Sequence, residues 1–208
     1  MPKLKWIGII TEKDYPKYQD GNIPKSAIKL KMPTTVKGQQ AKSWPFVMLS
    51  ALILAVAMFL KSRLDRSSPD FNMLELIIFV PVGIAIGFVL LSVHELLHAS
   101  VYPKNAQVYI GIVKPLTFVC LASYPVSKSR FIVIGLLPYI LGIVPLVLFL
   151  IIPLVMPAIS GILFGIAGMG LVSPSVDAYN VLQVLRQVPC GSKVQFHKED
   201  IYYFNRSV

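Results

Sequence analysis

The sequence predicts an α-helical integral membrane protein with about four transmembrane helices, a small β-hairpin and polar cytosolic ends. Hydrophobic residues form 55% of the 208-residue chain and charged residues only 14%, against about 25% charged residues in a typical soluble domain. The mean hydropathy is +0.66. Four apolar runs approach or exceed the length that crosses a bilayer, which predicts one membrane domain over residues 45–188. A basic segment, residues 1–44, precedes this domain, and a short tail, residues 189–208, follows it.

The basic N-terminal segment is predicted to contain short strands. Residues 1–44 hold nine lysines and three acidic residues. Polar and apolar side chains alternate at residues 3–6 and 28–32, and such alternation favours strands with one apolar face. A loosely ordered basic arm on the lipid surface accounts for the same pattern equally well.

The apolar runs predict the positions of the transmembrane helices. These runs are residues 45–60, 74–102, 131–156 and 158–172. Asn72 and Glu75 have the spacing of a helix cap and its partner, and would begin the second helix. Gly83 and Gly87 lie four residues apart in that helix, a spacing that lets another helix approach closely. The fourth run carries four glycines and is therefore the expected packing partner.

Alternating and β-branched residues outside the helices predict a small amount of sheet. Residues 107–113 and 117–124, separated by Lys114-Pro115, are typical of a hairpin at the membrane surface. The outer edge of this hairpin would either serve only as packed structure or bind an extended peptide as an added strand. After the fourth apolar run, residues 178–187 are predicted to be an amphipathic helix and residues 193–197 a strand.

The distribution of basic residues predicts how the chain is oriented. With both termini on one side of the membrane, that side carries 17 Lys and Arg residues, against three in the loop at residues 61–72. The positive-inside rule places the richer side in the cytosol. The net charge of +10 does not indicate nucleic acid, because the basic residues flank the apolar runs and form no stripe with aromatic residues. Anionic lipid is the expected partner of these charges.

The motif that carries chemistry is HELLH at residues 94–98, near the end of the second apolar run. On a helix, His94 and His98 share one face and can bind one metal ion, while Glu95 stands beside the water on that ion. A single histidine in an apolar helix is usually a packed core residue. Two histidines and a glutamate at the end of a membrane span favour a zinc site, because polar groups there are costly.

A catalytic zinc site needs a third protein ligand. The acidic residues in or next to the apolar runs are Glu75, Glu95 and Asp177. Glu75 lies about 28 Å from His94 at the helical rise, and Glu95 is needed as the base. Asp177 is therefore the expected ligand, and its alternative role is a cap for the helix that begins at Ala178. The weaker candidates, in the tail, are His197, Glu199 and Asp200.

Several segments resemble a family of zincin peptidases found among small prokaryotic membrane proteins. These are HELLH at 94–98, SRF at 129–131, Leu137-Pro138 and DAYN at 177–180. The arrangement, over residues 74–190, is also similar in plan to the site-2 proteases, in which an HExxH helix and a later aspartate-bearing helix share one zinc ion. The resemblance implies His94, His98 and Asp177 as zinc ligands and Glu95 as general base. It also implies a multi-pass protein in the cell membrane of a prokaryote.

The favoured function is therefore a zinc-dependent peptidase in the membrane that hydrolyses membrane-protein or peptide substrates near the cytosolic face. Glu95 would take a proton from the attacking water and deliver it to the leaving amine. The alternative is a non-catalytic membrane scaffold or transport-like protein with a structural metal, for instance with His197 as a fourth ligand. Asn180 would either contact substrate or a ligand carboxylate, or serve as an ordinary helix cap.

Overall fold

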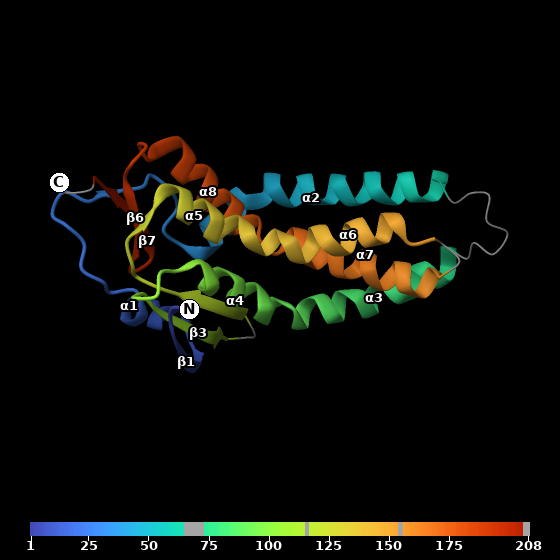
Figure 1. Cartoon of the computed structure of the whole chain (residues 1–208), viewed down its shortest axis with the longest axis horizontal. Helices are drawn as coiled ribbons and strands as arrows, with labels where there is room; N and C mark the ends of the chain where they lie inside the picture. Colours follow the sequence, from blue (N-terminus) through green and yellow to red (C-terminus); the bar gives the residue numbers. More distant parts are fainter. Residues whose placement is uncertain (65–72, 115–116, 154–155, 206–208) are drawn as a thin grey trace. The chain divides into compact units, whose positions relative to one another are not determined.

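The computed structural model describes residues 1–64, 73–114, 117–153 and 156–205. These residues form two compact units that alternate along the chain. The mixed unit, made of strands and helices, comprises residues 1–42, 92–137 and the chain from residue 176 onward. The helical unit comprises residues 43–91 and 138–175. Figure 1 labels the α-helices and some of the strands.

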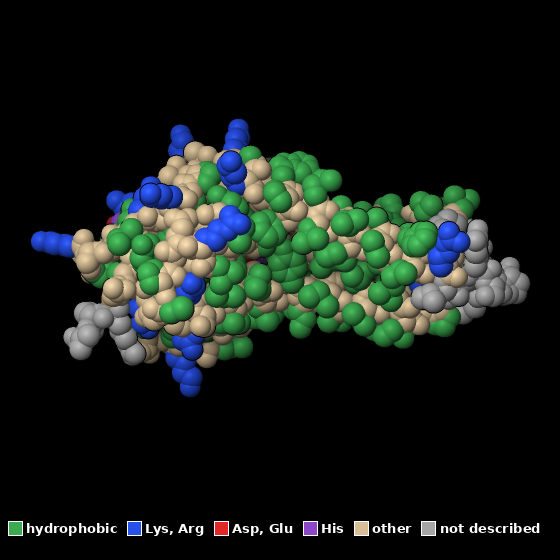
Figure 2. All heavy atoms as spheres, turned by 90° about the horizontal axis from the view of Figure 1, so that it is seen from above, with side chains coloured by type: hydrophobic (Ala, Val, Ile, Leu, Met, Phe, Trp, Pro, Cys, Tyr) green, Lys and Arg blue, Asp and Glu red, His purple; other side chains and the backbone are tan. Residues whose placement is uncertain are grey.

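Four helical stretches in the described part of the chain are long and apolar enough to cross a membrane. They are Val36–Arg63, Leu74–Val101, Lys128–Ile151 and Pro157–Gln187. The prediction of about four transmembrane helices is confirmed by their length and composition. On the face shown in Figure 2, hydrophobic side chains cover the helical unit, whereas Lys and Arg side chains gather over the mixed unit. An exterior this apolar is suited to lipid.

The helical unit is held together by close contacts between helix backbones. It contains α3 (Met73–Val89), α6 (Ile140–Ile151), α7 (Pro157–Val172) and most of α2 (Val36–Leu64). A Cβ atom at Gly83 of α3 would collide with the Ile162 carbonyl of α7. One at Gly161 of α7 would collide with the Leu76 carbonyl of α3. The predicted close packing of the second span against the glycine-rich fourth span is confirmed.

Helix ends differ from the predicted ends where a helix extends beyond its apolar run. α2 begins at Val36, ahead of the predicted residue 45, because the Thr35 hydroxyl accepts a hydrogen bond from the Gly38 N–H (3.2 Å) and caps the helix. The second span is divided at Leu90 into α3 and α4 (Leu91–Val101). The cap predicted at Asn72 lies outside the described residues.

The third and fourth spans are divided as well. α5 (Lys128–Leu136) begins ahead of the predicted residue 131, because the Ser127 hydroxyl accepts a hydrogen bond from the Arg130 N–H (3.3 Å). A 3-10 turn, Leu137–Tyr139, then separates α5 from α6 and contains Pro138. After α7 the chain forms α8 (Ser175–Gln187), which starts three residues before the predicted helix.

Two small sheets lie in the mixed unit. The first has the order β1-β3-β4, from β1 (Lys3–Ile10), β3 (Gln107–Val113) and β4 (Thr117–Leu121). The predicted hairpin is confirmed as the antiparallel pair of β3 and β4, although β4 ends at Leu121 rather than at residue 124. β1 confirms the strand expected near residues 3–6, and it pairs in parallel with β3, which the local pattern does not predict.

The second sheet is antiparallel, with the order β2-β7-β6-β5. Its strands are β2 (Ile28–Lys29), β7 (Asp200–Phe204), β6 (Lys193–His197) and β5 (Val126–Ser127). A 3-10 turn (Glu12–Asp14) and α1 (Tyr15–Tyr18) lie between β1 and β2. The strand predicted at residues 193–197 is confirmed, and β7 is an additional one. Segments near both ends of the chain thus pair around a core in which Val108, Val184 and Val194 are 0% exposed.

Candidate metal centre

α4 places the two histidines of the HELLH motif on its buried face. His94 is 5% exposed and His98 is 8% exposed. The two residues lie four positions apart, so their side chains are neighbours on the helix. Their Nε2 atoms are 3.0 Å apart, and the rings meet edge to face. Both imidazoles therefore direct Nε2 towards the same point.

The ring of His98 is oriented by a backbone carbonyl of α5. Its Nδ1 donates a hydrogen bond to the Ile134 carbonyl (2.7 Å). In a regular helix that carbonyl accepts from the N–H four residues later, but that residue is Pro138, which has no N–H. Because a carbonyl only accepts, the ring hydrogen of His98 resides on Nδ1. Its Nε2 keeps a lone pair that suits a metal ion.

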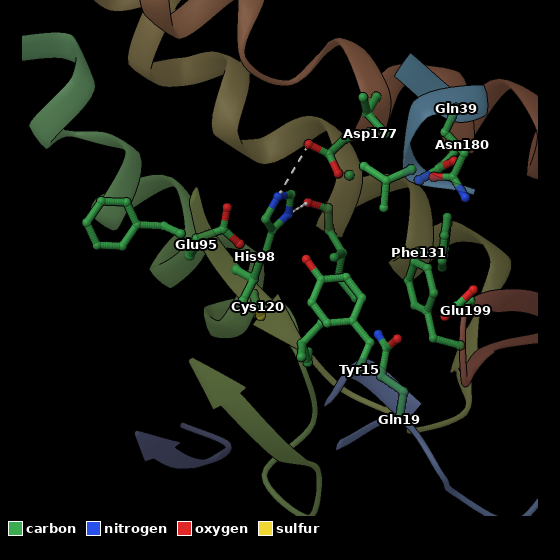
Figure 3. Close-up of a pocket in the computed structure, with 18 of the residues that line it drawn as sticks. Tyr15, Gln19, Gln39, Glu95, His98, Cys120, Phe131, Asp177, Asn180 and Glu199 are labelled. Atoms are coloured by element: carbon green, nitrogen blue, oxygen red, sulfur yellow. Dashed lines mark hydrogen bonds and ion pairs between the residues drawn. The ribbon is translucent and has the colours of Figure 1, made fainter. Parts of the chain in front are cut away.

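Asp177 comes from α8 and faces both imidazoles. Its Oδ2 lies 3.4 Å from His94 Nε2 and 3.5 Å from His98 Nε2, and Figure 3 shows its carboxylate beside the His98 ring. Gly135 of α5 allows α8 to approach, since a Cβ atom there would lie 2.5 Å from a Val181 methyl group. Asp177 is the third residue of α8, so it lies inside the helix and is not its cap.

Glu95 lies beside these atoms but farther from them than Asp177 does. Its Oε1 is 3.9 Å from His94 Nε2, and its side chain is 14% exposed. Cys120 of β4 lines the same cavity as Glu95. Desolvation raises the pKa of the Cys120 thiol well above its usual value, which disfavours the thiolate while no metal ion is bound.

The spacing of the converging atoms fits zinc. Two ligands bound at ~2.0–2.1 Å to one tetrahedral zinc ion lie about 3.3–3.4 Å from each other. The three separations among His94 Nε2, His98 Nε2 and Asp177 Oδ2 are 3.0, 3.4 and 3.5 Å. Two imidazole nitrogens and one carboxylate oxygen also form a donor set typical of catalytic zinc, which keeps a fourth position for water. The donor chemistry and the spacing agree.

The weaker candidates from the tail make contacts of their own. His197 Nδ1 donates a hydrogen bond to the Gly21 carbonyl (2.9 Å). Asp200 forms an ion pair with Lys29 (2.6 Å). Among the described residues, the ligand atoms of His94, Glu95 and His98 lie close enough together to share a metal ion, and neither Asp177 nor a tail residue belongs to this group. Asp177 is a candidate ligand because its Oδ2 lies within 3.5 Å of both imidazole nitrogens.

A cavity of about 360 Å³ lies beside Glu95, His98 and Asp177. Residues 118–121 of the edge strand β4 line it on one side. Polar side chains from α1, from the start of α2 and from α8 also line it, namely Tyr15, Gln19, Thr34, Thr35, Gln39 and Asn180 (Figure 3). Sequence patterns do not predict the N-terminal members of this set. These residues are brought to the cavity by the pairing of β1 with β3 and of β2 with β7, which no local pattern records.

The comparison with protein families agrees with this geometry. A family model described as "Putative zincin peptidase" matches residues 87–193, just over half of the chain. The chain belongs to this family. The part that matches the zincin peptidase model includes all four residues of the candidate centre and leaves residues 1–86 and 194–208 unmatched. No curated protein and no solved structure matches the chain.

Proposed function

We propose that the chain is a zinc-dependent, membrane-embedded peptidase that hydrolyses peptide bonds of membrane-associated proteins near the cytosolic face. Membership of the zincin peptidase family supports a metallopeptidase. The four apolar helical stretches support a location in the membrane. The observation that carries the proposal is the convergence of two imidazole nitrogens and one carboxylate oxygen within 3.5 Å of one another.

In this proposal, zinc is held by His94, His98 and Asp177. When bound there, zinc supplies a Lewis acid and lowers the pKa of a water towards neutrality. The Ile134 carbonyl keeps the His98 ring in the tautomer that leaves Nε2 free of hydrogen. Fixing the ring before the metal arrives reduces the cost of ordering the site.

Glu95 would act first as general base and then as general acid. Its carboxylate is next to the ligand atoms, and the Asp177 oxygen is closer to His94 Nε2 than the Glu95 oxygen is, so Glu95 remains available for a proton. It would accept a proton from the attacking water and pass it to the amine of the leaving peptide.

An extended substrate would lie along the outer edge of β4. This strand is the end strand of its sheet and pairs with β3 on one side. Residues 118–121 line the cavity next to Glu95. Strand addition would supply main-chain hydrogen bonds and align the cleaved carbonyl with the candidate centre. A substrate helix would have to unwind locally to bind in this way.

The orientation of the chain is part of the same proposal. The two termini and the segment at residues 104–130 together carry 17 of the 20 Lys and Arg residues. By the positive-inside rule these parts face the cytosol, where anionic lipid headgroups would attract them. The HELLH motif, which precedes residue 104, would then lie near the cytosolic end of its span.

The alternative function, a non-catalytic protein with a structural metal, has less support. A structural zinc site is closed by a fourth protein ligand. The fourth ligand considered from the sequence, His197, is instead hydrogen-bonded to the Gly21 carbonyl. Three converging donors with a neighbouring glutamate favour catalysis.

The test compares the parent chain with three variants reconstituted in lipid vesicles that contain a library of membrane proteins. Zinc content is measured by elemental analysis and cleaved bonds by mass spectrometry. We expect Glu95→Gln to keep zinc and to lose at least ~100-fold in turnover, because the proton acceptor is gone. His94→Ala should lose zinc. Glu75→Gln, a control for removing a carboxylate from an apolar helix, should retain both. Turnover by Glu95→Gln at the parent's rate would overturn the proposal.

A further inference from the structure

The cavity beside the candidate centre has a polar wall that the proposed chemistry does not use. Its volume of about 360 Å³ is in the range of sites that bind small molecules, about 300–1,000 Å³. The polar side chains away from the candidate centre include Gln19, Thr34, Thr35, Gln39, Asn180 and Glu199. Figure 3 shows Gln39 and Asn180 next to each other, with Gln19 and Glu199 among the other lining residues. Apart from Asn180, these residues lie outside the part that matches the family model.

Asn180 brings a buried hydrogen-bond acceptor to this wall. It lies one helical turn after Asp177 on α8 and is 8% exposed. Its Oδ1 has no hydrogen-bond partner among the described residues. Buried acceptors are nearly always paired, because leaving one without a donor is destabilising. This oxygen has almost no accessible surface, so the Asn180 side chain has to turn towards the cavity before a group that carries N–H donors can supply the missing partner.

The charges that line the cavity are mainly acidic. Glu95, Asp177 and Glu199 contribute carboxylates, and no Lys or Arg is among the described residues that line it. Within the same described set, Glu199 forms no ion pair, whereas its neighbour Asp200 is paired with Lys29. A cationic ligand would therefore find a carboxylate without a counter-charge. Away from the proposed zinc ligands, an anionic ligand would meet the Glu199 carboxylate and no Lys or Arg side chain among the described residues that line the cavity.

The remaining walls are apolar and aromatic. Phe131 and Phe196 line the cavity with their ring centroids 5.6 Å apart. Long basic side chains lay their methylene stems along such surfaces while the charged head reaches a polar partner. Aromatic faces also attract cations.

We propose that this cavity is a specificity subsite that receives an arginine or lysine side chain of the substrate, close to the cleaved bond. The inference rests on the proposed peptidase function. Glu199, which is exposed, pairs with the cationic head. The Asn180 side chain turns towards the cavity, and its amide oxygen accepts one of the N–H groups of that head. The stem lies against Phe131 and Phe196. Of these four residues, Phe196 and Glu199 lie outside the part that matches the family model, and Phe131 and Asn180 lie inside it.

Binding of short blocked peptides to the full chain in lipid nanodiscs tests this subsite. The peptides are identical except for one central residue, which is arginine, its neutral isostere citrulline, or glutamate. Affinities are measured with the metal-free parent chain and again with the zinc-loaded Glu95→Gln variant, so that neither measurement depends on turnover. We expect arginine to bind about tenfold more tightly than citrulline, as a charge-assisted hydrogen bond predicts, and glutamate to bind most weakly.

Two matched variants assign the preference to a residue. Glu199→Gln should reduce the ratio of the arginine-peptide affinity to the citrulline-peptide affinity to about one. Asp20→Asn should leave this ratio unchanged. Asp20 is an exposed carboxylate beside Gln19 that does not line the cavity. Asn180→Leu, which removes the acceptor at similar size, should weaken arginine binding in both forms of the protein.

Equal binding of arginine and citrulline peptides would overturn the subsite. An equal loss of preference in Asp20→Asn and Glu199→Gln would also overturn it, because general surface charge would then explain the effect. Failure of the peptidase proposal is distinguished from failure of the subsite proposal, because cleavage and binding preference are measured independently. A chain that prefers arginine peptides but never cleaves a peptide has the subsite without the enzyme, and one that cleaves without preference has the enzyme without the subsite.

Discussion

Asp177 supplies the negative charge that lies next to both imidazole nitrogens, at 3.4 and 3.5 Å. Replacing it with asparagine keeps the shape of the side chain and removes the charge. We expect Asp177→Asn to lower zinc affinity at least about 100-fold, because one of three protein ligands is lost. Competition with a coloured chelator measures the affinity.

The matched control for this prediction is Glu199→Gln. It removes a carboxylate from the same cavity at a residue that is not one of the three proposed ligands, His94, His98 and Asp177. Its zinc affinity should equal that of the parent chain. An unchanged affinity in Asp177→Asn would show that the aspartate is not a ligand.

Side-chain spacing predicts part of the site, and backbone groups explain what it misses. His94 and His98 are predicted because a helix brings positions four apart onto one face. Asp177 is predicted to lie near the histidines because it is the acidic residue that remains, once Glu75 and Glu95 are excluded, at the cytosolic end of an apolar run. The Ile134 carbonyl is not predicted, since every residue carries a carbonyl and no residue type marks the one that binds the imidazole. For Ile134 a signal does exist, namely the proline four residues later.

Among the helices, the junction at Leu137–Tyr139 has a testable consequence for the site. Pro138→Ala would add an N–H that competes with His98 for the Ile134 carbonyl. We expect zinc affinity to fall about tenfold, as is typical when a partner of a ligand is lost. Nitrogen-15 chemical shifts of the His98 imidazole would then show two tautomers in exchange, one with hydrogen on Nδ1 and one with hydrogen on Nε2.

Two further variants separate this effect from a general effect on the helix. Pro145→Ala, inside α6, should leave zinc affinity unchanged. Replacing residue 138 with lactic acid, which forms an ester without N–H, should restore the affinity that alanine loses. Equal affinities of the parent chain and Pro138→Ala would contradict the role assigned to the missing N–H.

The contact between α3 and α7 predicts a contrast between two glycines of one helix. Gly161→Ala places a Cβ atom against the Leu76 carbonyl, whereas a Cβ atom at Gly168 would have only a Leu54 methyl group, at 3.9 Å, within contact range. We expect Gly161→Ala to lower the free energy of unfolding by about 1–3 kcal/mol through overpacking. Gly168→Ala should be neutral or slightly stabilising, because alanine favours the helix. Steric-trapping measurements in bicelles would report both values, and equal values would contradict the close packing.

Element positions are predicted well where one physical cause dominates. The glycine-rich fourth span and strand β3 match their expected residues because apolar length and alternation specify them directly. The starts of α2 and α5 are missed, since Thr35 and Ser127 cap them several residues outside the apolar runs. Hydropathy marks where lipid begins and carries no information about where a helix begins.

At the scale of the molecule, the orientation proposal can be tested with a natural probe. Cys190 is exposed, and it follows α8 in a segment proposed to face the cytosol. In a Cys120→Ser background expressed in bacteria, a membrane-impermeant maleimide should label Cys190 only after the cells are opened. A cysteine introduced between residues 65 and 72, which connect the first two apolar stretches, should be labelled in intact cells. The reverse pattern would contradict the positive-inside assignment.

The class of the whole molecule follows from composition, whereas its sheet topology does not. An apolar fraction of 55% and four long apolar stretches are enough to predict a multi-pass membrane protein. The parallel pairing of β1 with β3 joins segments about a hundred residues apart, and no local pattern records such a partner. The walls of the cavity depend on that pairing, so the sequence alone does not predict the proposed subsite.

The separation of the proposed ligands along the chain has a consequence for biosynthesis. Asp177 follows His98 by 79 positions, so the third proposed donor leaves the ribosome well after the two histidines. In the same way, β1 is made about a hundred residues before its partner β3, and β2 is made long before β7. Under the proposed function, a nascent chain would therefore be unable to hydrolyse peptide bonds until the segment that carries Asp177 has been made and has packed against α4.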